Sequence, residues 1–240
     1  MDTERAHWAD HLEELRKRLF FALVPFVFLV AASFFFSDFL VEVVSAPIKR
    51  SIPALYFLSP YEAFVVKLNV SLVSGIVLSS PILFIQLWKF VSPGLYAREQ
   101  KVILPLAVIS TVLFVIGVLF AYFIVIPFAL QFFLGFQTDT LLPLISFDSY
   151  ISFFLSLLVV FGVVFDVPVI LVGLIALRVI GSAFLSRQRK IVVILIFTVA
   201  AILTPTVDIV TQCLLAVPLW LLFELSIVIG KQVEKRRSRD

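Results

Sequence analysis

The chain has 240 residues, of which 62% are hydrophobic and 15% are charged, and its formal net charge at pH 7 is +3. Its mean hydropathy of +1.14 is far above that of a water-soluble domain. The apolar residues come in runs of helical length rather than in short alternating segments, which argues against a transmembrane β-barrel. We therefore predict an all-α, polytopic membrane protein.

Six membrane spans are predicted, because a helix of about 20 apolar residues crosses the ~30 Å hydrocarbon core of a bilayer. The runs of suitable composition are residues 19–40, 63–90, 102–134, 149–176, 191–204 and 210–229. The last two are expected to be too short for a full bilayer, since the 14 residues of the fifth run reach only about 21 Å. The third run is expected to tilt and to bend near Pro105 and Pro127. Spans of such unequal length predict a concave body.

Basic side chains predict the orientation of these spans, because they are retained on the cytoplasmic side of the membrane. Sixteen of the 19 Lys and Arg residues lie before the first span, around the second and fourth loops, or in the tail at 230–240. Both termini are therefore predicted to face the cytoplasm. Lys67, within a span, is interpreted as a side chain that snorkels to the interface. Trp88 falls near the predicted inner boundary, where amphipathic rings favour the headgroup region.

Residues 3–18 are predicted to form an amphipathic helix that lies along the membrane surface before the first span. Its apolar stripe consists of Trp8, Leu12, Leu15 and Leu19. Glu14 lies just beside this stripe, four residues before Arg18, and an i,i+4 pair in this order stabilises a helix by a few tenths of a kcal/mol. Such a pair would explain Glu14 by structure alone, and it is the alternative to a functional role for this residue.

Two segments carry motifs that are similar to those of a known family. Residues 11–18 read HLEELRKR, and residues 88–99 read WKFVSPGLYARE. The first resembles the N-terminal motif of TatC, the multispanning subunit of the twin-arginine (Tat) protein translocase. The second resembles the first cytoplasmic loop of that family, Trp-x-Phe-x-x-Pro-x-Leu-Tyr-x-x-Glu. Further matches lie at residues 45–47, 120–123, 161–168 and 203–205, and the resemblance covers about residues 11–230.

The resemblance implies a receptor and assembly platform rather than an enzyme. It implies binding of the twin-arginine signal peptides of folded preproteins, and assembly with the single-span proteins TatA and TatB for export driven by the protonmotive force. It also implies a prokaryotic cytoplasmic membrane, self-association in a receptor complex and no cofactor. The signal-peptide-binding residues that it carries over are Glu14, Arg16, Phe90, Tyr96 and Glu99. Two carboxylates suit two arginines, because a guanidinium group meets a carboxylate through two hydrogen bonds and lysine does not.

Further residues are singled out by the same resemblance. Thr204 and Gln212 flank the last outer turn, where TatA or TatB docks in the family and where polar side chains can hydrogen-bond a neighbouring helix. Pro47 lies in the first outer loop. Asp166 stands where the family usually has Glu, and we predict that it points into the concave, partly hydrated face, since a lipid-exposed carboxylate costs several kcal/mol. Structural pairing is the alternative for Asp166, and more so for Glu224.

Two other functions stay open on the sequence. In a proton-coupled small-solute transporter, Asp166 and Glu224 would be coupling sites, although no pair of Gly- or Pro-interrupted half-helices marks two corresponding halves. A membrane scaffold without peptide recognition also fits the composition. We expect neither ATP chemistry nor a metal site, because the chain has no Gly-x-x-x-x-Gly-Lys-[Ser/Thr] motif and only two His and one Cys. Membrane lipid is an expected partner, and nucleic acid is not.

Overall fold

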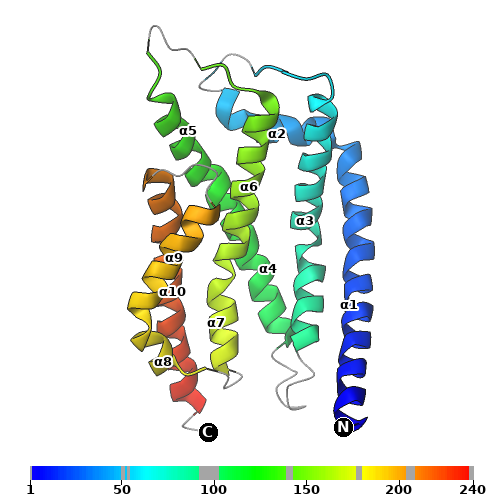
Figure 1. Ribbon diagram of the computed structural model, residues 1–240, viewed down its shortest axis with the longest axis vertical. Helices are drawn as coiled ribbons and strands as arrows, with labels where there is room; N and C mark the ends of the chain where they lie inside the picture. Colours follow the sequence, from blue (N-terminus) through cyan, green and yellow to red (C-terminus); the bar gives the residue numbers. More distant parts are fainter. Residues whose placement is uncertain are drawn as a thin grey trace.

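The computed structural model describes residues 2–49, 52, 55–91, 103–138, 143–176, 180–203 and 209–237. Its elements are α1 (Asp2–Phe35), α2 (Ser37–Lys49), α3 (Glu62–Val91), α4 (Ile103–Phe120), η3 (Ala121–Val125), α5 (Ile126–Leu134), α6 (Phe147–Phe165), α7 (Val167–Ala176), α8 (Ser182–Arg187), α9 (Arg189–Leu203) and α10 (Ile209–Arg237). The predicted all-α class is confirmed. The helix α1 begins and α10 ends at one end of the bundle, the terminal end, whereas α2 lies across the opposite end, the α2 end (Figure 1).

The first helix, α1, is continuous, so no turn separates the expected surface helix at 3–18 from the span that follows it. The proline of this helix, Pro25, lies beyond residue 18, and the helix continues through it. An unbroken helix keeps its backbone N–H and C=O groups paired, which matters most where lipid replaces water. The expectation of a separate surface helix is therefore wrong.

The predicted span at 19–40 is also wrong at its far end, because the chain turns after α1. Phe36 N–H donates to Ser33 O at 3.1 Å, and α2 then leaves across the end of the bundle (Figure 1). One side of α2 buries Val44 and Ile48 against the bundle. Apolar composition extends through both helices, so hydropathy alone does not detect the change of direction.

Two side chains from the spanning helices hold α2 in this place. The hydroxyl group of Tyr150 in α6 donates to Val44 O at 2.8 Å. Lys67 Nζ in α3 lies 2.7 Å from Asp38 Oδ1 in α2. Lys67 thus joins two helices, a role that the snorkelling interpretation did not include.

The long span predicted at 102–134 is present as α4, η3 and α5, which continue one another. The bend predicted near Pro127 coincides with η3, a π-helical turn in which Ile126 N–H donates to Ala121 O, five residues back. Pro127 has no N–H for the carbonyl group four residues before it, which favours the wider turn. Pro105 lies in the first turn of α4, where N–H groups have no helical partner, and α4 continues through it. The second predicted bend is therefore wrong.

Proline is accommodated differently in α3, which matches the predicted span 63–90 within one residue at each end. Pro81 cannot donate to Val77 O, and Ser80 Oγ donates to that oxygen instead, at 2.7 Å. A neighbouring hydroxyl group therefore replaces the missing backbone donor.

Glycine residues let α4 and α6 approach each other closely. Gly117 of α4 faces the backbone carbonyl group of Phe161, and Gly162 of α6 faces the ring of Phe114. At both places a Cβ atom would overlap the facing atoms. Small residues of this kind allow the close van der Waals packing that drives helix association in lipid.

Five helical segments of the described chain are long and apolar enough to cross a membrane. They are Glu13–Phe35, Glu62–Phe90, Ile103–Leu134, Phe147–Ala176 and Gln212–Lys235. The predicted fifth span corresponds to α9, whose 15 residues reach about 22 Å, less than the hydrocarbon core. The expectation of a short sixth span is wrong, because α10 has 29 residues and continues into the basic tail.

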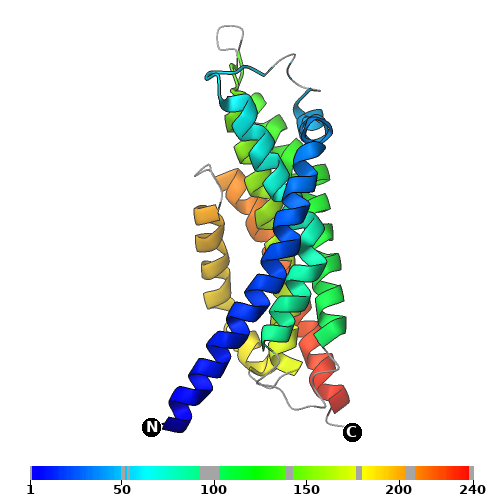
Figure 2. The same ribbon diagram turned by 90° about the vertical axis from the view of Figure 1, so that its right-hand side faces the viewer.

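The helices associate in a defined order. The helix α1 packs on α3, both α3 and α6 pack on α4, and α10 packs on α7 and α9. Figure 2 shows α9 and α2 on opposite sides of the bundle. The faces formed by α2 and by α9 are therefore separate surfaces of the bundle.

Candidate functional site

Glu14 lies on α1 near the terminal end, with 28% of its side chain exposed. Its Oε1 atom accepts a hydrogen bond from Nη2 of Arg18 at 3.1 Å, which is the i,i+4 pair expected from their spacing. A partly exposed pair of this kind contributes less than about 1 kcal/mol. The carboxylate of Glu14 is therefore held in place, yet it can exchange Arg18 for another guanidinium group at small cost.

Arg16 lies on α1 two residues after Glu14, so its side chain points to a different face of the helix. It lines a hollow of about 270 Å³ together with Glu13, Lys17, Phe20 and Phe21. The hollow combines a carboxylate, two cations and two aromatic rings. It adds a mixed charged and aromatic surface next to Glu14.

The second half of the predicted peptide site follows α3. Phe90 is half-buried in the last turn of α3, whereas Tyr96 and Glu99 lie outside the described residues. The helices α1 and α3 lie side by side, and α3 ends toward the terminal end (Figures 1 and 2). The chain therefore leaves α3 at the end of the bundle where Glu14 lies.

Asp166 occupies the junction between α6 and α7 and is only 3% exposed. Neither of its carboxylate oxygens has a hydrogen-bond partner of ordinary geometry. Ser110 of α4 is the polar side chain beside it. Asp166 faces the protein interior and not lipid, as predicted, although it is enclosed between helices rather than set in a partly hydrated concave face. The position is the C-cap of α6, directly before α7 begins at Val167.

A hydrogen bond connects this interior position with the end of α3. Trp88 Nε1 donates to Ser110 Oγ at 3.1 Å, and Trp88 is only 7% exposed. Its ring lies against Gly173 of α7, where a Cβ atom would come within 2.7 Å of it. Trp88 is therefore packed inside the protein rather than projecting from it. Trp88 near the end of α3 thus contacts Ser110 of α4, and Ser110 lies beside Asp166.

The helices α9 and α10 carry a third group of polar contacts. Gln212 Nε2 donates to Phe197 O at 2.8 Å, so this predicted docking residue also links the two helices. Arg189 Nη2 lies 2.9 Å from Glu224 Oε2. The structural pairing that was the alternative for Glu224 is thus present. Thr204 lies outside the described residues.

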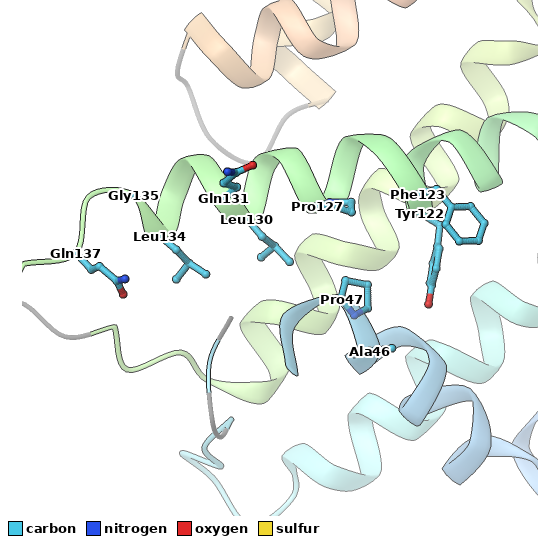
Figure 3. Close-up of a pocket in the computed structure, with 10 residues that line it drawn as sticks. All are labelled: Ala46, Pro47, Tyr122, Phe123, Pro127, Leu130, Gln131, Leu134, Gly135 and Gln137. Atoms are coloured by element: carbon cyan, nitrogen blue, oxygen red, sulfur yellow. The ribbon is translucent and has the colours of Figure 1, made fainter. Parts of the chain in front are cut away.

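Pro47 lines a groove of about 600 Å³ between α2 and the segment from η3 to the end of α5 (Figure 3). The other lining residues are Ala46, Tyr122, Phe123, Pro127, Leu130, Gln131, Leu134, Gly135 and Gln137. Two of the motifs singled out in the sequence, 45–47 and 120–123, meet here. The hydroxyl group of Tyr122 donates to Val43 O at 2.9 Å and so holds α2 beside the groove.

The sequence did not predict a role for Ser110, the burial of Trp88 or the contact between Tyr122 and α2. The available signal for Ser110 was a hydroxyl group inside an apolar span, which needs a partner there. For Tyr122, the signal was Pro47 itself, since a proline in a membrane helix leaves one carbonyl group for a neighbour to satisfy.

These features define a polytopic helical membrane protein with polar side chains at the terminal end, in its interior and along α9 and α10. Among the described residues, no group of three or more His, Cys, Asp and Glu side chains is placed to hold a metal ion. Residues 10–218 match the family described as Sec-independent protein translocase protein (TatC). The chain therefore belongs to the TatC family.

Individual relatives agree with this assignment. The chain is 40% identical to the Sec-independent protein translocase protein TatC of Aquifex aeolicus, over 95% of this chain and 96% of the relative. It is 40% identical to the TatC protein of Helicobacter pylori strain 26695, over 93% of this chain and 87% of the relative. A crystal structure of the twin-arginine translocase receptor TatC in DDM matches with a TM-score of 0.83 and 40% identity, covering 92% of this chain and 99% of that one. A translocase component differs in class from the solute transporter considered above.

Proposed function

We propose that this protein is the receptor subunit of a twin-arginine translocase in a prokaryotic cytoplasmic membrane, with both termini in the cytoplasm. It binds the signal peptides of folded preproteins at the terminal end. The observation that carries the proposal is the position of Glu14, a partly exposed carboxylate on a helix packed against α3. The segment that follows α3 contains Glu99, the second predicted carboxylate.

The chemistry of Glu14 supports recognition of arginine in particular. In the free protein Glu14 already binds a guanidinium group, that of Arg18, through a single 3.1 Å contact. An arginine of a signal peptide can replace Arg18 and use both carboxylate oxygens, because its donors form a planar fork. Lysine offers a point charge without this geometry. Two carboxylates, at Glu14 and Glu99, would then select two arginines.

The solved relative, a twin-arginine translocase receptor, supports the same interpretation. Export driven by the protonmotive force belongs to the same proposal.

The experiment that tests peptide binding is photo-crosslinking with a synthetic signal peptide that carries benzophenone next to its arginine pair. The proposal predicts adducts within residues 13–18 and 88–102 of the protein in nanodiscs. A matched Lys-Lys peptide serves as the control and should give much weaker adducts at the same segments. Adducts of equal yield from both peptides, or adducts confined to the α2 end, would contradict the proposal.

Partner binding is proposed along α9 and α10, for single-span proteins of the TatA and TatB type. The short helix α9 presents exposed apolar side chains, among them Ile194, Leu195 and Ile202. Gln212 adds a polar group near them, and a hydrogen bond between membrane helices contributes roughly 0.6–2 kcal/mol. Self-association of receptor subunits belongs to the same proposal.

A photoactivatable amino acid at Ile194 tests this docking face in membranes that contain the single-span proteins. The proposal predicts an adduct with one of them at Ile194. The control position is Leu104 of α4, which is 62% exposed and lies on another helix. Equal adducts at both positions would show contact without a defined docking face.

A further inference from the structure

The groove beside Pro47 is not used by the proposed function. It lies at the α2 end, far from Glu14 along the bundle, and Figure 3 shows its lining side chains converging from α2 and from the segment that ends in α5. It also lies on the side of the bundle away from α9, as the place of α2 in Figure 2 shows. Neither the peptide site nor the predicted partner face therefore accounts for it.

The lining of the groove changes in polarity along its length. Gln137 lies at its outer end beyond α5, whereas Gln131, six residues earlier on α5, points away from Leu130 and Leu134 (Figure 3). Deeper along the same segment the wall is apolar, with Leu130, Pro127 and Phe123. None of the described residues that line it is charged. An occupant is therefore expected to have an uncharged polar part at the outer end and an apolar part that runs inward.

The length of the apolar wall matches one leaflet of a bilayer. From Leu134 to Phe123 the chain advances 11 residues, about 17 Å at 1.5 Å per residue. One leaflet of a ~30 Å hydrocarbon core is ~15 Å thick. The apolar wall is therefore about as long as the hydrocarbon of one leaflet is thick.

The groove has room for a single hydrocarbon chain. Its volume is about 600 Å³, and its walls come from α2 on one side and from the segment between η3 and the end of α5 on the other. A membrane helix is the competing occupant, and the last experiment below separates it from lipid.

We infer that this groove binds one acyl chain of a glycerophospholipid from the leaflet at the α2 end. The chain lies along Leu134, Leu130 and Phe123, opposite Pro47. The amide group of Gln137 donates to an ester carbonyl group of the lipid. The hydrogen bond from Tyr122 to Val43 keeps α2 beside the chain.

The test uses the full-length protein in vesicles of phosphatidylethanolamine and phosphatidylglycerol, with a small fraction of phosphatidylcholine that carries a diazirine in one acyl chain. After irradiation, labelled peptides are identified by mass spectrometry. Adducts should concentrate in residues 43–49 and 120–138, relative to the equally lipid-exposed surface of α1. Even labelling of all lipid-facing helices would overturn the inference, because it would mean ordinary solvation by lipid.

Two substitutions fill the groove at different places. Leu134→Trp fills the outer end of its apolar wall, and Gln137→Trp fills its exposed rim, where folding is not at risk. Each should lower labelling of residues 120–138 roughly fivefold, which corresponds to ~1 kcal/mol of binding free energy. Phe128→Trp is the control, since Phe128 is 50% exposed on α5 but does not line the groove. An equal loss in the control, or no loss in either filled variant, would overturn the inference.

A photoactivatable amino acid at Gln137 in native membranes separates lipid from protein occupants. A lipid adduct is the expected result. An adduct with a second copy of this chain or with another protein would show that the groove is a protein interface and would overturn the inference.

Discussion

Tyr122 donates its hydroxyl hydrogen to the carbonyl oxygen of Val43 over 2.9 Å, and Val43 lies four residues before Pro47. In an uninterrupted helix that carbonyl group accepts from the N–H of residue 47, which proline lacks. Tyr122 therefore satisfies the backbone group that Pro47 leaves open. Because these residues lie 79 positions apart, the contact links α2 to the long span through η3.

Tyr122→Phe should lower the free energy of unfolding by about 1 kcal/mol, because the carbonyl group of Val43 loses its donor. Thermal unfolding in detergent measures the change. Tyr56→Phe is the control, since Tyr56 is 48% exposed near the same end of the bundle. A loss of equal size in both variants would show that the hydroxyl contact of Tyr122 has no special role.

A double-mutant cycle tests the role of Pro47 in the same contact. Pro47→Ala restores the N–H that can donate to Val43 O within α2, so Tyr122→Phe should cost less in that background than in the native chain. The coupling free energy is expected to be about 0.5–1 kcal/mol. Strict additivity of the two substitutions would contradict the explanation.

Gly117→Ala should destabilise the protein by about 1–3 kcal/mol, because the new Cβ atom would overlap the backbone carbonyl group of Phe161 and backbone atoms cannot move aside easily. Denaturation in mixed micelles measures this loss. Gly181→Ala provides the comparison, since the nearest atom to a Cβ there is at 3.7 Å, an ordinary contact. If Gly117→Ala unfolds like the native protein, the close approach of α4 and α6 is not required.

Asp166→Leu should raise stability and lower export, because a buried carboxylate without hydrogen-bond partners is unfavourable to folding. The expected gain is about 1 kcal/mol. Asp166→Asn should keep the fold and also impair export. Asp148→Asn, at the start of α6, is the control for loss of a carboxylate. Export of a twin-arginine reporter at the normal rate by Asp166→Leu would mean that the carboxylate has no role in transport.

The pair of Arg189 and Glu224 should respond to exchange of its charges. Each single reversal, Arg189→Glu or Glu224→Arg, should lower the melting temperature by a few degrees, because two like charges then lie about 3 Å apart. The double reversal should recover at least half of the loss. No recovery would indicate that packing, and not the charge pair, decides the contact between α9 and α10.

The spans could be predicted from the sequence where a single physical requirement determines them. The bounds of α3 differ by one residue from the predicted 63–90, because a bilayer demands an apolar run of nearly constant length. The pair of Glu14 and Arg18 was likewise predictable, since i,i+4 neighbours share one face of a helix.

Other features depend on contacts between distant segments, and local pattern does not contain them. The turn at Phe36 comes directly before Ser37 and Asp38, but apolar residues continue beyond them, so the predicted span extended to residue 40 and included the start of α2. Trp88 is typical of a headgroup position by type and place, yet Ser110 gives its N–H a partner in the interior and Gly173 leaves room for its ring. Asp166 faces inward for a similar reason, because α4 and α7 enclose the junction where it lies.

The central claim is that Glu14 and Glu99 select a pair of arginines, and peptide affinity tests it most directly. The protein in nanodiscs is titrated with a fluorescent signal peptide and with its Lys-Lys counterpart. The native chain should prefer the twin-arginine peptide by roughly tenfold, about 1.4 kcal/mol. Glu14→Gln and Glu99→Gln should each weaken that preference, the double variant should abolish it, and Glu13→Gln, the neighbouring control, should retain it. An undiminished preference in the double variant would contradict the account.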